Sequence, residues 1–146
     1  MTGKLRVSLI ILILFGMSLS LPGIVAAADV ILIGNRSVPE SQLSPREIKK
    51  IYLGKKNLWS NDLKVVYVMT ANAAVSKKFL KSYVKKNPDM YDKYWKKKMF
   101  TGSGNPPLVF EKEKDLVKYV SETKGAVGYV SSGFYSDSVK ILAVLH

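Results

Sequence analysis

Short runs of β-branched and aliphatic residues alternate with amphipathic helical patterns along this chain, and no other feature constrains its fold as much. The runs at 30–33, 64–69, 126–130 and 139–145 are typical of strands. Helical patterns over 44–54, 73–86, 87–100 and 113–122 lie between them. Strands separated by helices require crossover connections, so the sequence predicts the α/β class. We expect a small mixed sheet flanked by about four helices.

Two of these helices have well-marked ends. Ser44 is placed to cap the first, with Pro45 at its first position and Glu47 three residues past the cap, and Gly54 ends it. Asn87 is placed to cap the third helix. The helical spacing then predicts which side chains share a face. These are Ile48, Ile51 and Tyr52 in the first helix, and Tyr91, Tyr94, Trp95 and Met99 in the third.

The first 28 residues have a different character from the rest. Lys4 and Arg6 precede an apolar run at 7–21, Pro22-Gly23 interrupts it, and Ala26-Ala27-Ala28 supplies the small residues that a signal peptidase reads. The apolar core is shorter than the roughly 20 residues needed to cross a bilayer. We therefore expect residues 1–28 to be a cleaved signal peptide, with a retained anchor as the alternative. Residues 29–146 would form one periplasmic or secreted domain.

Composition excludes several kinds of chemistry. The chain has no cysteine, which rules out disulfide frameworks, thiolate metal sites and cysteine nucleophiles. Its one histidine, His146, is the terminal residue and is poorly placed for a catalytic triad or a metal site. The pattern of acidic residues predicts no pair of carboxylates for general acid–base catalysis. We expect a protein that is not an enzyme and that uses no metal or cofactor.

The chain is strongly basic, with a formal net charge of +12. Without Lys4 and Arg6, 21 basic residues stand against the 11 acidic ones, which leaves +10. Such a field gathers anions, although a solvated helix face that keeps the protein soluble explains it equally well. Only Arg36 and Arg46 are arginines in this part, so sequence-specific nucleic-acid recognition is not expected. The lysines cluster in the second and third helical patterns: Lys77, Lys78, Lys81, Lys85, Lys86, Lys93, Lys96, Lys97 and Lys98.

The turn after the strand at 64–69 is the first candidate site. A helix that opens directly after a strand presents unpaired amides and the positive end of its dipole. Thr70, Asn72 and Ser76 could join those amides in holding an oxyanion, with Lys77 close by. Taken alone, these residues favour the simpler interpretation, in which Thr70 or Asn72 caps the helix.

The loop Thr101-Gly102-Ser103-Gly104-Asn105 is the second candidate site. Glycines expose backbone amides that can form an anion-binding nest, to which Ser103 and Asn105 would contribute polar side chains. The loop lacks the lysine and hydroxyl of a P-loop and is followed by Pro106-Pro107. A plain connecting loop is the favoured interpretation from the residues alone.

Three separated segments resemble phosphate-type periplasmic substrate-binding proteins of ABC transporters. The segment at 43–59, reading LSPREIKKIYLGKKNLW, is similar to their helix, Ile-Phe-x-Gly-Lys and Trp signature. The segment at 125–130, GAVGYV, resembles a Gly-Ala-Ile-Gly-Tyr-Val strand, and Tyr94-Trp95 with the segment at 100–107 resembles a single-lobe branch. Thr70 and Asn72 match the position of the family's Ser-Gly-Thr phosphate motif.

The resemblance implies a function and partners. It implies one lobe of a periplasmic-binding-protein-like fold at 29–146 that binds a small oxyanion, phosphate first, in connection with a membrane permease. A second envelope protein, or a second copy of the chain, would supply the missing lobe. The implied ligand-binding residues are Thr70, Asn72, Ser76, Lys77, Ser103 and Asn105. The alternative is a non-enzymatic envelope protein that binds acidic polymers or a protein partner through its lysines.

Overall fold

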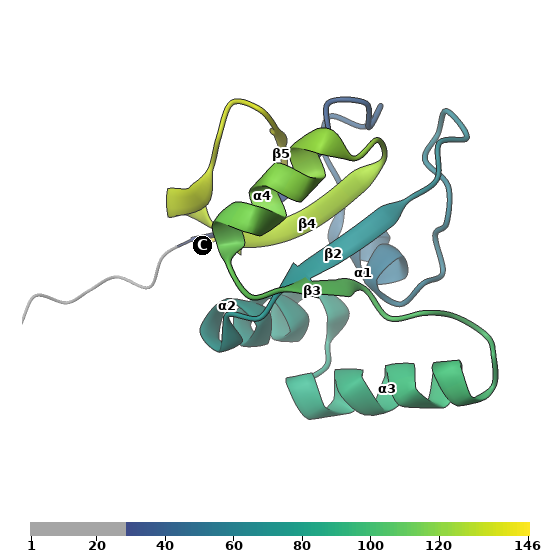
Figure 1. The fold of residues 1–146 in the computed structure, drawn as a ribbon. Helices are drawn as coiled ribbons and strands as arrows, with labels where there is room; N and C mark the ends of the chain where they lie inside the picture. The colour runs from purple at the N-terminus through teal and green to yellow at the C-terminus, as the bar shows by residue number, and fades with distance from the viewer. Residues whose placement is uncertain (1–28) are drawn as a thin grey trace, which may run out of the picture.

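The computed structural model describes residues 29–146, and the predicted signal peptide lies outside the described residues. Within this range the chain forms five strands and four α-helices (Figure 1). The strands are β1 (Val30–Gly34), β2 (Val66–Thr70), β3 (Leu108–Phe110), β4 (Ala126–Ser131) and β5 (Lys140–Leu145). The α-helices are α1 (Pro45–Tyr52), α2 (Ala73–Phe79), α3 (Pro88–Phe100) and α4 (Glu113–Glu122), with a π-helical turn η1 (Leu80–Val84) and a 3-10 turn η2 (Ser132–Phe134).

The five strands form one mixed sheet in the order β3-β2-β4-β1-β5. β2 runs parallel to both β3 and β4, whereas β1 is antiparallel to β4 and β5. The carboxyl ends of β2, β3 and β4 therefore meet at one edge of the sheet, where the start of β1 also lies because Val30 pairs with Ser131. We call this the carboxyl edge. The predicted α/β class, mixed sheet and helix number are confirmed.

Helices cover both faces of the sheet. α4 packs Leu116 and Val120 on one face, where they meet Ile33 and Val68 from the strands. The opposite face carries the larger core, which includes Tyr52 of α1 and residues of α2, η1 and α3. Figure 1 shows α4 in front of the sheet and α3 set apart along the bottom of the molecule. None of the helices in the described part of the chain is long and apolar enough to cross a membrane.

Local capping explains where the well-predicted helices begin. Ser44 and Glu47 form a reciprocal capping box at the start of α1, and the Asn87 side chain accepts the amide of Met90 at the start of α3. The Ser44 contacts lower the pKa of Glu47, since hydrogen bonds favour its charged form. The predicted inward residues of α1 are fully buried. In α3, Tyr91 and Trp95 are buried as predicted, but Met99 is 54% exposed and points away from the core.

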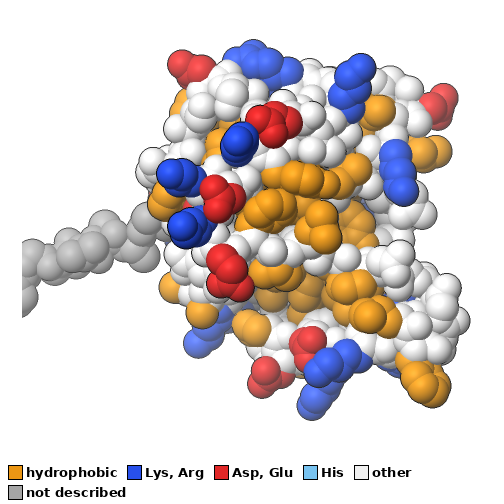
Figure 2. Space-filling view, viewed as in Figure 1, with side chains coloured by type: hydrophobic (Ala, Val, Ile, Leu, Met, Phe, Trp, Pro, Cys, Tyr) orange, Lys and Arg blue, Asp and Glu red, His pale blue; other side chains and the backbone are white. Residues whose placement is uncertain are grey.

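Two other predictions are corrected. The helix predicted over 73–86 is α-helical only to Phe79 and continues as the π-helical turn η1, which ends at Lys85 in the left-handed region. Leu80 and Val84 are buried, as their helical spacing predicts, but the change from α-helix to π turn has no signal in that spacing. β3 was not predicted, because three residues after two prolines become a strand only by pairing with β2. Its Leu108 and Val109 are each 56% exposed, and Figure 2 shows apolar side chains across the middle of the molecule, where Figure 1 has β3.

The junction between α4 and β4 gives a stability test. Gly125 has φ +75°, and a Cβ there would lie 2.1 Å from the carbonyl oxygen of Lys64. Gly102 has a similar φ of +65° but open space around it. We expect Gly102→Ala to cost about 1 to 2 kcal/mol for the backbone alone, and Gly125→Ala to cost at least about 2 kcal/mol more because the backbone must move. Urea unfolding of both variants measures the difference, and equal losses would contradict the clash.

Candidate functional site

The turn between β2 and α2 is held together by its own side chains. The Thr70 hydroxyl accepts the amide of Asn72 at 3.1 Å, and the Asn72 side-chain oxygen accepts the amide of Val75 at 3.3 Å. The Ser76 hydroxyl donates to the carbonyl of Thr70 at 2.7 Å. Asn72 is thus the N-cap of α2, as the simpler interpretation of the sequence predicts. Three of the predicted site residues, Thr70, Asn72 and Ser76, are brought together here.

A carboxylate from the start of α4 occupies the carboxyl edge beside this turn. The Asn72 side-chain nitrogen donates to Glu113 Oε2 at 3.3 Å. The backbone amide and the hydroxyl of Ser131, the last residue of β4, donate to Glu113 Oε1 at 2.7 and 2.9 Å. Glu113 is only 8% exposed. We call Asn72, Glu113 and Ser131 the edge cluster; it holds an oxyanion group on three converging donors.

Two of the predicted residues face the interior. Thr70 is 1% exposed, and Ser76 is 8% exposed with its hydroxyl 2.9 Å from the hydroxyl of Tyr129. The Tyr129 ring stacks on Phe79 at 3.8 Å between centroids. Burial raises the pKa of Tyr129, although the Ser76 contact acts in the opposite direction, so the phenol stays protonated. Thr70 and Ser76 therefore hold the turn in position from the core side, and they do not line its outer surface.

The outer surface of the turn carries donors that a helix leaves unpaired. Ala73 and Ala74 begin α2 and are exposed, and amides of a first helical turn have no partner within the helix. Lys77 lies one turn further along the same helix and is exposed. These groups border the edge cluster, since Asn72 belongs to both. The carboxyl edge thus combines the hydrogen-bonded carboxylate of Glu113, the unpaired amides of the first turn of α2 and the nearby Lys77 ammonium group.

The structure places Ser103 and Asn105 elsewhere. They line a cavity of about 500 Å³ with Tyr67, Trp95 and Gly54, and the Tyr67 hydroxyl donates to the Asn105 carbonyl at 2.8 Å. Half-burial raises the pKa of Tyr67 to about 12. Tyr67 lies near the start of β2 whereas Thr70 ends it, so this cavity and the carboxyl edge are separate. The two groups of predicted site residues do not form one site.

Sequence reasoning missed Glu113 and Ser131. An acidic residue at the first position of a helix ordinarily complements the helix dipole, and Glu113 has that signal and no other. Its contact with Asn72 spans 41 residues and depends on α4 crossing the sheet between β3 and β4. Within residues 29–146 there is no group of three His, Cys, Asp or Glu side chains able to hold a metal ion.

Comparison with solved structures identifies similar folds. A putative phosphate ABC transporter substrate-binding protein from Clostridium perfringens with bound phosphate matches with a TM-score of 0.61 and 20% identity, over 79% of this chain and 45% of that one. An ABC-type phosphate transport receptor from Vibrio cholerae matches with a TM-score of 0.53 and 20% identity, over 79% of this chain and 46% of the receptor. PstS from Borrelia burgdorferi matches with a TM-score of 0.57 and 16% identity, over 80% of this chain and 47% of PstS.

These similarities cover less than half of each matched protein, so the chain spans about one of the two halves of such a structure. A comparison with curated proteins gives no significant match. Residues 24–142 match the family described as the PBP superfamily domain. Because that match covers most of the sequence and agrees with the fold, the chain belongs to the family described as the PBP superfamily domain.

Proposed function

We propose that this protein is an exported, non-enzymatic module that binds a small oxyanion, phosphate first, for an ABC-type transporter. The proposal is supported by the family match and by the structural neighbours, which include a putative phosphate ABC transporter substrate-binding protein and an ABC-type phosphate transport receptor. Export to the periplasm is supported by the character of residues 1–28. Ligands of open α/β sheets bind outside the carboxyl ends of the strands, which favours the carboxyl edge as the ligand site.

The observation that carries this proposal is the carboxylate already bound there. Asn72 and Ser131 direct three donors at the oxygens of Glu113, and this contact supports the edge as a site for an oxyanion group. A phosphate that entered would take the same donors and add the first-turn amides of Ala73 and Ala74. Glu113 would have to turn away, because two anions on one set of donors repel each other. The internal carboxylate therefore acts as a competitor of the ligand.

A single lobe covers only one side of a ligand. The matched phosphate receptors are more than twice the aligned length of this chain. We propose that the remaining contacts come from the permease, or from a second envelope protein or a second copy of the chain. The exposed Lys77 beside the turn would favour approach of an anion to the open side.

The first prediction concerns Asn72. Asn72→Ser retains a capping oxygen for α2 but removes the side-chain nitrogen that faces the edge cluster. Loss of a hydrogen bond to a charged group should weaken phosphate binding at least about tenfold. Calorimetric titration with phosphate at low and high salt measures this, with Ser103→Ala as the matched control in the separate cavity. Equal affinities for N72S and the unsubstituted protein would place any phosphate site elsewhere.

The second prediction concerns Glu113. Glu113→Gln keeps the size of the side chain and removes its charge, so the bound internal group competes less strongly with phosphate. We expect phosphate affinity to rise at least about tenfold at neutral pH. Glu111→Gln, an exposed acid two residues earlier, is the control for overall charge. If E113Q binds phosphate no better than E111Q, Glu113 does not compete for the site.

A further inference from the structure

The outer surface of α3 combines lysines with exposed apolar side chains. Met90, Lys93, Lys97 and Phe100 are spaced three, four and three residues apart, which aligns them along one stripe of the helix. All four are exposed, and Phe100 is 94% exposed. Met99 beside it is 54% exposed. Figure 2 shows blue, red and orange side chains along the lower margin, over α3.

The helix does not need these residues to attach to the domain. Its inner side is fixed by the Tyr91 hydroxyl, which donates to the carbonyl of Tyr52 at 2.7 Å, and by the Tyr94 hydroxyl, which donates to the carbonyl of Leu53 at 2.6 Å. The buried Trp95 adds contacts with Tyr67 at 6.0 Å between ring centroids. The outer stripe therefore has no role in the core, and its composition must be explained by water or by a partner.

The charge on the stripe is available to an anionic partner. Lys96 pairs with Asp92 at 2.6 Å, so those two charges largely cancel. Lys93 and Lys97 take part in none of the ion pairs formed within residues 29–146. Asp89, in the first turn, is the other acid of the helix and complements its dipole. The stripe is thus positive from its middle to its carboxyl end, where Phe100 lies.

Three of the last four carbonyls of α3, those of Lys97, Lys98 and Met99, have hydrogen-bond donors within the chain. The Thr101 hydroxyl donates to the carbonyl of Lys97, and the Ser103 hydroxyl donates to that of Lys98. The amide of Gly102 donates to the carbonyl of Met99. Carbonyls at a helix end ordinarily need water, which is scarce below the headgroups of a bilayer. These three carbonyls therefore do not depend on water for a hydrogen-bond donor.

We propose that the outer surface of α3 docks the protein onto an anionic phospholipid bilayer. Phe100, with Met99 and Met90, would insert among the headgroups and upper acyl chains, while Lys93 and Lys97 contact lipid phosphates. A soluble polyanion would use the lysines but has no place for a fully exposed phenylalanine and two methionines. The contact is peripheral, with the helix lying in the plane of the interface. It is independent of the anion site at the carboxyl edge.

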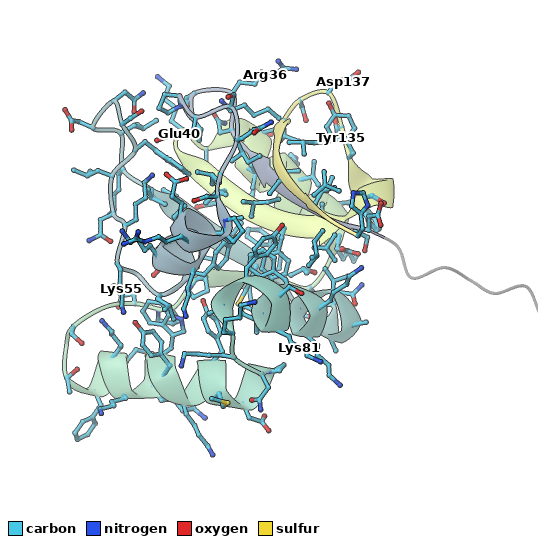
Figure 3. The ribbon with its side chains drawn as sticks, turned by 180° about the vertical axis from the view of Figure 1, so that it is seen from behind. Arg36, Glu40, Lys55, Lys81, Tyr135 and Asp137 are labelled. Carbon is cyan, nitrogen blue, oxygen red and sulfur yellow. The ribbon has the colours of Figure 1, made fainter. Side chains whose placement is uncertain are left out.

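A tryptophan at position 100 tests insertion directly. Trp59 and Trp95 are both buried, so Phe100→Trp adds the solvent-exposed indole that responds to surroundings. With vesicles of equal parts phosphatidylglycerol and phosphatidylcholine, we expect its emission to move to shorter wavelength; phosphatidylcholine vesicles should leave it unchanged. Tyr135→Trp is the matched control, since Tyr135 is 45% exposed and lies on the far side of the molecule from α3 (Figure 3). An unchanged F100W emission with anionic vesicles would overturn the proposal.

Vesicle sedimentation measures how much Phe100 and the two lysines each contribute to binding of the anionic vesicles. Phe100→Ser should lower the partition coefficient at least about tenfold through lost apolar contact. The double variant K93Q/K97Q should lower it about fivefold for each lysine. The double variant K114Q/K118Q removes the same charge from exposed positions on α4 and should have little effect. If both double variants weaken binding equally and F100S does not, the contact is diffuse electrostatics and the proposed docking surface is wrong.

Discussion

A fully buried tyrosine connects most parts of this domain. The Tyr52 hydroxyl donates to the carbonyl of Val68 in β2 at 3.0 Å, and its own carbonyl accepts the hydroxyl of Tyr91 from α3. Its ring packs against Phe79 at 4.8 Å and Tyr129 at 5.7 Å between centroids. Burial raises the pKa of Tyr52 well above its usual range, so the hydroxyl remains a donor. One residue, through its side chain and its backbone carbonyl, thereby connects α1, α2 and α3 to β2 and β4.

The geometry of the carboxyl edge follows from this packing. Phe79 and Tyr129 fix α2 against β4, and the Ser76 hydroxyl then joins Tyr129 to the carbonyl of Thr70 at the end of β2. Asn72 and Ser131 consequently point at the same place, where Glu113 accepts their hydrogen bonds. The Glu113 carboxylate satisfies these part-buried donors, which avoids the cost of leaving them unpaired.

The sequence predicts those features that local chemistry decides. The capping residues Ser44 and Asn87 determine where α1 and α3 begin, and Asn72 caps α2 in the same way. Features that depend on contacts distant in the chain could not be predicted. β3 exists only because β2 lies beside it, and Glu113 reaches Asn72 only after α4 has packed on the sheet. Similarly, Ser103 and Asn105 resemble a nest but face the cavity beside Tyr67.

The charges of the domain act at two different ranges. Lysines on the outer side of α3 raise the local concentration of anions and speed their approach, but salt screens such effects beyond about 8 Å at physiological ionic strength. The Glu113 carboxylate lies in the edge cluster and is 8% exposed, so its repulsion toward an incoming anion is screened far less. In the proposed function, the net positive charge would therefore govern encounter with anions and with anionic surfaces. Whether an anion stays at the carboxyl edge would be decided by one negative charge within hydrogen-bonding distance of the same donors.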